Sequence, residues 1–167
     1  MIIKKASVVD IPLIQELAHT IWPVAYENIL SQAQLEYMLD SMYSLNALQS
    51  QIVNLQQVFL LAMEEEKSPI AFASYGKISE LSDDRKFKLH KLYVLPQYQG
   101  KGVGQLLIQY INNTIRSAQQ TILSLNVNRH NTAVEFYKRL GFRVVKEEDI
   151  DIGNGYFMND YVMEKLI

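Results

Sequence analysis

A glycine-rich segment between a predicted strand and a predicted helix constrains this chain more than any other feature. Residues 88–95 are predicted as a strand, residues 96–104 as a loop, and the following run as an amphipathic helix. Three of the seven glycines, Gly100, Gly102 and Gly104, lie in this loop. Glycine lets another group approach the backbone closely, and the first turn of a helix presents unpaired N–H groups and the positive end of its dipole. The segment therefore predicts an anion site, for which phosphate is the usual ligand.

Composition indicates one globular domain spanning residues 1–167. The chain is 49% hydrophobic and 20% charged, with a net charge of −2, which allows a full core and disfavours nucleic acid or anionic membranes as partners. It contains no cysteine, which excludes disulfides, thiolate metal sites and a cysteine nucleophile. The three histidines share no ligand spacing, so no metal site is predicted. Neither a signal-peptide pattern nor a membrane-length apolar run is visible, so a cytoplasmic location is expected.

Hydrophobic periodicity predicts an α/β (α+β) fold with the element order β-α-α-α-β-β-β-α-β-α-β-β. The strand at 88–95, the helix after it and the strand at 121–127 form a βαβ unit, so these two strands should be parallel. The other connections are short and favour antiparallel pairing. A mixed, mostly antiparallel sheet of seven strands with helices on both faces is therefore expected.

Local signals predict several boundaries. Pro23 predicts that the first helix ends at Trp22, because the residue before a proline avoids the α region. Polar composition predicts loops at residues 79–86 and at the acidic residues 147–155, after which residues 156–166 form the last strand. The aromatic residues of the helical segment are expected to pack against the sheet, with one or two lining a substrate pocket as the alternative; they are Trp22, Tyr26, Tyr37 and Tyr43.

Three families bind phosphates on glycine loops. The P-loop spacing does not fit, and the dinucleotide pattern would need glycine or alanine at Gln105. The run Gln99–Gly104 instead resembles the pyrophosphate loop of the GNAT acyltransferase superfamily, Gln/Arg-x-x-Gly-x-Gly/Ala. The run from Asn131 to Phe142 is similar to the family's second signature, in which an Asn and an Ala precede Phe-Tyr-x-x-x-Gly-Phe. One residue separates Asn131 from Ala133 where many members have two, which makes Asn128 an alternative to Asn131.

The resemblance implies a GNAT-type sheet whose parallel central strands splay apart past Val94, with acetyl-CoA or another acyl-CoA as co-substrate. By this resemblance, backbone amides of the glycine loop bind the pyrophosphate, and the pantetheine arm pairs with the central strand as an added strand would. Lys101 adds charge to the phosphates or is simply solvated. The implied cofactor-binding residues are Leu92, Tyr93, Val94, Gln99, Gly100, Lys101, Gly102, Val103, Gly104, Asn131 and Tyr137.

The implied chemistry is direct attack of an amine on the thioester. A lysine-type amine has a pKa of about 10.4, so it must lose a proton first. The N–H of Val94 would stabilise the oxyanion, and Tyr137 matches the family's general acid, with a core tyrosine as the alternative. His90 has the side-chain parity of Leu92 and Val94, and it matches a position where the arylalkylamine branch uses histidine in proton removal. A structural or surface histidine, and a water chain without a dedicated base, are the alternatives.

The acceptor is expected to be a small amine. Residues 35–48 and 156–158 are loosely similar to a bacterial polyamine acetyltransferase branch, and carboxylates could pair with ammonium groups or simply be solvated. An amino acid or a peptide N-terminus is the alternative acceptor, a non-catalytic acyl-CoA sensor or a nucleotide-binding protein the alternative function, and a homodimer is expected from the family. The available carboxylates are Glu27, Glu36, Asp40, Glu147, Glu148, Asp149 and Asp151.

Overall fold

The computed structural model describes residues 1–65, 68–78, 85–116 and 121–167. These residues form a seven-stranded sheet in the order β1-β2-β3-β4-β5-β7-β6, in which only β4 and β5 pair in parallel. The predicted mixed, mostly antiparallel sheet is therefore confirmed. The strands are β1 (Ile2–Lys5), β2 (Val58–Met63), β3 (Pro69–Lys77), β4 (Lys86–Val94), β5 (Ile122–Asn128), β6 (Arg143–Gly153) and β7 (Tyr156–Leu166). The helices are α1 (Ile11–Ala25), α2 (Gln32–Tyr43), α3 (Leu45–Val53), α4 (Val103–Ile115) and α5 (Ala133–Arg139).

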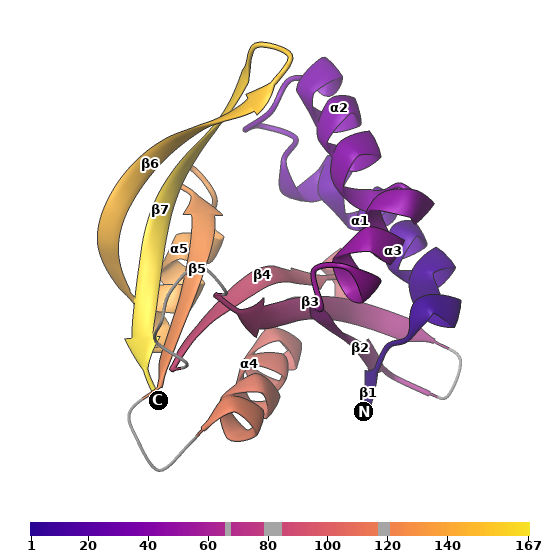
Figure 1. The fold of residues 1–167 in the computed structure, drawn as a ribbon, viewed down its shortest axis with the longest axis vertical. Coiled ribbons are helices and arrows are strands. Elements are labelled where there is room, and N and C mark those ends of the chain that lie inside the picture. The colour runs from indigo at the N-terminus through magenta and orange to yellow at the C-terminus, as the bar shows by residue number, and fades with distance from the viewer. Residues whose placement is uncertain (66–67, 79–84, 117–120) are drawn as a thin grey trace.

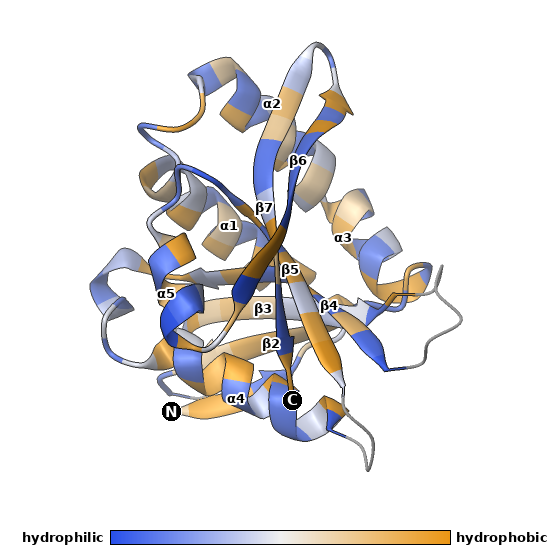
Figure 2. Cartoon of the chain, turned by 90° about the vertical axis from the view of Figure 1, so that its left-hand side faces the viewer, coloured by the Kyte–Doolittle hydropathy of each residue, from blue (hydrophilic) through white to orange (hydrophobic). Residues whose placement is uncertain are grey.

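The sheet consists of two arms that diverge. Figure 1 shows β5, β7 and β6 standing away from β1–β4, with the two halves meeting near the start of β4 and β5. One core packs α1, α2 and α3 against one face of β2 and β3, and a second packs α4 and α5 against the other face and β5. Orange apolar segments of the central strands lie between these helical layers in Figure 2. The second core contains residues of both arms, Leu60 and Ala71 from one and Leu125 and Met163 from the other, and so joins them.

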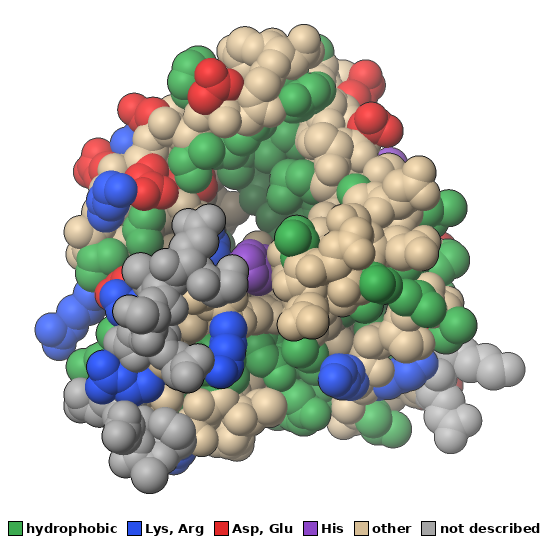
Figure 3. Space-filling model, viewed as in Figure 1, with side chains coloured by type: hydrophobic (Ala, Val, Ile, Leu, Met, Phe, Trp, Pro, Cys, Tyr) green, Lys and Arg blue, Asp and Glu red, His purple; other side chains and the backbone are tan. Residues whose placement is uncertain are grey.

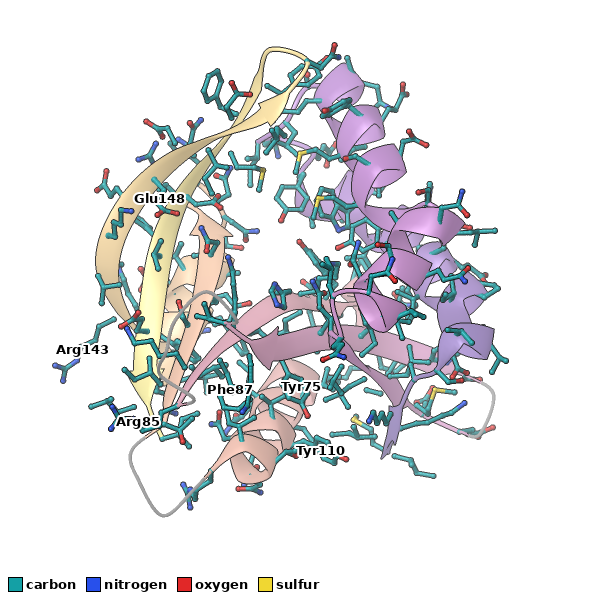
Figure 4. The ribbon with its side chains drawn as sticks, in the orientation of Figure 1. Tyr75, Arg85, Phe87, Tyr110, Arg143 and Glu148 are labelled. Atoms are coloured by element: carbon teal, nitrogen blue, oxygen red, sulfur yellow. The ribbon has the colours of Figure 1, made fainter. Side chains whose placement is uncertain are left out.

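Helix α4 is fixed against the sheet by a continuous apolar stripe. Its fully buried residues recur at helical spacing and include Val103, Leu107 and Ile111. Tyr75 of β3 and Tyr110 of α4 lie near one another beside this helix, and Phe87 lies close to them at the start of β4 (Figure 4). Because this helix begins directly after the glycine loop, its packing also fixes where the loop lies.

The predicted end of the first helix is wrong, and so is the predicted start of β4. Helix α1 continues through Pro23 to Ala25, and Tyr26 N–H still bonds Trp22 O at 3.0 Å. Trp22 and Tyr26 are both at most 5% exposed, so burial on either side of the proline outweighs its local preference. The predicted loop at 79–86 has residues 79–84 outside the described part of the chain, and Lys86 already belongs to β4.

The acidic run predicted as a loop is instead most of β6. This strand pairs with β7 as far as Gly153 opposite Tyr156, which leaves only Asn154 and Gly155 as the turn. Both turn residues have positive φ, 55° and 77°, as a two-residue type I′ hairpin requires. The β6 strand lies at the sheet edge, where exposed charges suit it.

Truncating the buried α4 stripe should destabilise the protein strongly. Leu107 is 0% exposed, so Leu107→Ala should lower the free energy of unfolding by about 2–5 kcal/mol. Its neighbour Leu106 is 38% exposed, so Leu106→Ala should cost less than about 1 kcal/mol. Urea unfolding of the two variants measures the difference, and equal losses would contradict this packing.

Candidate active site

The parallel strands β4 and β5 separate well before their ends. Their pairing stops at Leu89 opposite Leu125, although β4 continues to Val94 and β5 to Asn128. The predicted splay is therefore present, but it begins five residues before Val94 rather than after it. A cavity of about 270 Å³ occupies this divergence, and Figure 3 shows the face hollowed there.

A β-bulge explains the early separation. Tyr75 and Ser74 are adjacent on β3, yet they pair with Leu89 and Lys91, which leaves His90 as an extra residue on β4. Such a bulge bends the strand and increases its twist. Leu89, Leu92 and Val94 consequently pack into the same core. The alternation that predicted a shared face holds for Leu92 and Val94, and the bulge interrupts it at His90.

The cavity brings together most of the predicted side chains. It is lined by His90, Leu92 and Tyr93 of β4, by Asn131 and by Tyr137 of α5. Val94 and the glycine loop lie beyond this lining, farther along β4 and at the start of α4. Of the helical aromatics, Trp22 and Tyr26 line the cavity as well as being buried, so both predicted alternatives hold for them. Tyr37 instead donates to Ile152 O at 2.7 Å.

Beyond the bulge, β4 presents free backbone groups to the gap. The N–H of Leu95 donates to Ile70 O of β3 at 2.9 Å. Backbone groups of successive strand residues point to opposite sides, so the N–H and C=O of Val94 face away from β3 and into the gap. The Gln99 side chain donates to that carbonyl at 3.2 Å, which leaves the Val94 N–H directed at the space between the strands.

The three glycines of the loop are required for different structural reasons. Gly100 and Gly102 have φ of +73° and +79°, and a Cβ on either would meet no atom within 4 Å. Gly102 precedes α4, whose start has no side-chain cap. A Cβ on Gly104 would instead lie 3.1 Å from Cζ of Phe136, so this glycine lets α4 approach α5. The Lys101 ammonium lies 5.1 Å from the Tyr98 ring centroid and is exposed. An open, uncapped helix start fits a diphosphate.

Tyr137 and Asn131 are held by local contacts on α5. The Tyr137 ring packs edge-on against Phe136 and Phe142, with centroids 5.2 and 5.6 Å away, and burial raises the pKa of its hydroxyl. Asn131 Oδ1 accepts the Ala133 N–H at 2.8 Å, so Asn131 caps the helix and also lines the cavity. Its alternative, Asn128, lines the same cavity and accepts the N–H of the residue two positions on.

Sequence reasoning missed one polar residue of this cavity, Asp160, and one contact between two residues that it had named. Tyr26 and Tyr93 join their hydroxyls at 3.0 Å across α1 and β4. Asp160 of β7 is 3% exposed and also lines the cavity. Alternation along β7 could have signalled it, because Asp160 stands on the same strand face as Met158 and Val162. The acidic residues of β6 that were candidate amine ligands are not part of this lining.

His90 is neutral at pH 7. Burial, then Lys91 and Lys88, lower its pKa from 6.5 to about 4. Between these values the unfolded chain binds a proton that the folded chain does not, so this contribution lowers stability as the pH falls from 6.5 towards 4. Urea unfolding at pH 7.5 and pH 5 should show a smaller loss for His90→Gln than for the unaltered chain. An identical loss in both proteins would contradict the burial of the imidazole.

Comparison with known proteins agrees with a site for an acyl-CoA. A family model for the acetyltransferase (GNAT) domain matches residues 26–164. A spermidine N(1)-acetyltransferase from Thermoplasma acidophilum is 28% identical over 167 residues, covering 98% of this chain and 95% of that protein. An L-amino acid N-acyltransferase from Escherichia coli is 27% identical over 89 residues, 53% of this chain and 52% of that protein.

The structural comparison extends over nearly the whole chain. The crystal structure of the PaiA N-acetyltransferase from Thermoplasma acidophilum in complex with coenzyme A has a TM-score of 0.80 at 28% identity, covering 99% of this chain and 98% of that one. Within the described residues, no helix is both long and apolar enough to span a membrane. The diverging strands, the open glycine loop and the matched family model lead to one conclusion: the chain belongs to the GNAT family of acetyl-CoA-dependent N-acetyltransferases.

Proposed function

We propose that the chain transfers the acetyl group of acetyl-CoA to the primary amine of a small cationic molecule of the polyamine class, in a ternary complex. The observation that carries this is the cavity at the β4–β5 divergence, in which Tyr137 and the open edge of β4 meet. The likeness to a spermidine N(1)-acetyltransferase over the whole chain supports the amine class.

The glycine loop and β4 would hold the co-substrate. Backbone N–H groups of residues 99–104 would bind the pyrophosphate, because this helix start is uncapped and its two left-handed glycines leave the approach open. The exposed Lys101 would add positive charge beside them. Leu92, Tyr93 and Val94 would offer the free edge of β4 to the pantetheine arm, and the Asn131 amide would reach it from the turn before α5.

Three groups would serve the chemistry. The N–H of Val94 faces the gap and would donate to the oxyanion. Tyr137 would protonate the departing thiolate, since its raised pKa keeps it protonated at neutral pH. His90, neutral because its pKa is lowered to about 4, would accept a hydrogen bond from the water that carries the proton of the amine away.

A second acceptor class is favoured by a specific likeness. The partial match to an L-amino acid N-acyltransferase supports an amino acid or a peptide N-terminus as acceptor. Release of free thiol from acetyl-CoA, followed across a panel of polyamines, monoamines, amino acids and peptides, separates the two classes. Binding of CoA without turnover on any of these amines would instead favour an acyl-CoA sensor.

Removing the Tyr137 hydroxyl should separate turnover from binding. Tyr137→Phe should lower kcat about 10²–10⁴-fold, which is the usual contribution of a general acid, while CoA affinity changes little. Tyr110 is 40% exposed on α4, so Tyr110→Phe is the matched control and should leave kcat unchanged. The assay is thiol release with isothermal titration of CoA. Unaltered turnover in Tyr137→Phe would refute the assigned role.

A negative charge in the glycine loop should weaken CoA binding. Gly102 and Gly155 share a left-handed backbone, with φ of +79° and +77°, and open space where a Cβ would stand. Both substitutions to Asp therefore carry the same backbone strain, but only Gly102→Asp places a carboxylate at the proposed pyrophosphate site. CoA affinity should fall at least about tenfold in Gly102→Asp and stay unchanged in Gly155→Asp. Equal affinities would place the pyrophosphate elsewhere.

A further inference from the structure

Asp160 is a buried carboxylate to which the mechanism proposed above assigns no role. It lies on β7, directly between Asn128 of β5 and Glu148 of β6 in the strand register. It is 3% exposed, and its Oδ1 is buried without a hydrogen-bond partner. Leaving a carboxylate oxygen buried and unpaired is costly, so this oxygen calls for a donor that the described residues do not supply.

The neighbouring strand row shows that Asp160 faces the cavity. Met158, two residues earlier on β7, and Ile150, its register partner on β6, line the cavity together with Asp160. Asp149 lies one row along and therefore on the opposite face of the β6–β7 hairpin, where it pairs with Arg129. Asp149 and Asp160 therefore lie in adjacent rows of the β6–β7 hairpin but on opposite faces of it.

The groups around Asp160 do not fully offset its burial. Burial is the largest influence and raises its pKa; a hydrogen bond from Asn126 and the charge of Lys88 lower it, Glu148 raises it and Arg129 lowers it, and the pKa is raised overall. Arg129 is bound to Glu147 and Asp149 on the outer face. Glu148, labelled on the β6 arm in Figure 4, is bound to the Lys146 ammonium at 2.6 Å.

Aromatic and hydroxyl groups complete the surroundings of the carboxylate. Tyr26 follows directly after α1, and its hydroxyl hydrogen-bonds that of Tyr93 at 3.0 Å. Burial and, to a smaller extent, the charge of Asp160 raise the pKa of Tyr26. The Trp22 ring stacks at 4.6 Å from that of Tyr26 and lines the same cavity. Aromatic faces beside a carboxylate favour an alkylammonium group, because ring quadrupoles attract cations. A neutral amine could donate an N–H to Oδ1 but would leave the negative charge uncompensated, and an anionic acceptor would be repelled.

We propose that Asp160 binds the ammonium group of the acceptor through Oδ1 and takes a proton from it before attack. This rests on the acetyltransferase function proposed above. One N–H bond breaks, its electron pair stays on nitrogen, and the proton forms a bond to Oδ1. The neutral amine then attacks the thioester carbonyl, and the C–S bond breaks as the thiolate takes the proton of Tyr137. The new amide nitrogen returns its surplus proton to Tyr137, and Asp160 passes its own to the water that His90 would hold, which carries it to solvent.

The test compares two amines in two carboxylate variants of the full chain. The probes are n-butylamine, cationic at pH 7.5, and 2,2,2-trifluoroethylamine, mostly neutral at that pH. Asp160→Asn should lower kcat/KM for n-butylamine at least about 30-fold, which corresponds to about 2 kcal/mol, and lower it far less for the neutral amine. Asp149→Asn, on the outer face, should change neither value. CoA affinity should be unchanged in both variants.

Two outcomes of this test overturn the assignment. Equal losses for the two amines, or no loss for either, would show that Asp160 does not handle the charge of the acceptor. If the unaltered chain acetylates no amine of the panel, the acetyltransferase function itself fails and this inference fails with it. The two failures are distinguishable, because the first leaves the unaltered chain active.

A measurement on the unaltered chain covers the case in which Asp160→Asn does not fold. The probes n-butylguanidine and n-butylurea have nearly the same shape, but only the first is a cation. n-Butylguanidinium should compete with n-butylamine at a concentration at least about tenfold lower than n-butylurea. Equal competition by the two would overturn the proposal, since an unpaired buried carboxylate must favour the cation.

Discussion

Backbone hydrogen bonding between β4 and β5 stops at Leu89 and Leu125, and the functional site depends on that interruption. Two strands that run on without pairing expose N–H and C=O groups inside a protein, where such groups need partners. The Gln99 amide supplies one partner, at Val94 O. The remaining free edge is stable only because each strand is paired on its far side, β4 with β3 and β5 with β7. The fold therefore maintains an opening that a ligand can complete.

Burial shifts the pKa values of the ionisable side chains around this opening. It raises the pKa of the Tyr137 hydroxyl and lowers the pKa of His90 to about 4. It also lowers to about 8 the pKa of Lys91, whose ammonium lies 5.6 Å from the ring centroids of both Tyr43 and Phe59. Each of these groups is pushed towards its neutral form. Burial raises the pKa of the Asp160 carboxyl in the same way, and low dielectric strengthens the Coulomb interaction between its ionised form and any cation in the opening.

The sequence patterns predicted those parts of the fold that depend on local signals. The βαβ unit, the glycine loop and the amphipathic α4 follow from periodicity and turn chemistry over short stretches. Pro23 and the bulge at His90 could not be foreseen in the same way. Burial of Trp22 and Tyr26 against other elements overrides the proline, and the bulge appears only in the register of β4 against β3. The dipeptide Asn154–Gly155 is a typical hairpin turn, but the acidic composition of the preceding residues led to the prediction of a loop there.

The same distinction separates the two halves of the site. Most of the proposed co-substrate contacts come from one continuous segment, the end of β4, the loop and the start of α4, so a short sequence signature can identify them. The proposed acceptor contacts come from Tyr26, directly after α1, and Asp160 of β7, which are far apart in the chain and meet only through the tertiary fold. Either can change without disturbing the glycine loop, because the loop is positioned by the packing of α4 and not by these residues. A chain of this architecture can therefore keep its acyl donor while its acceptor varies, and acceptor specificity must be sought in cavity side chains from separate elements.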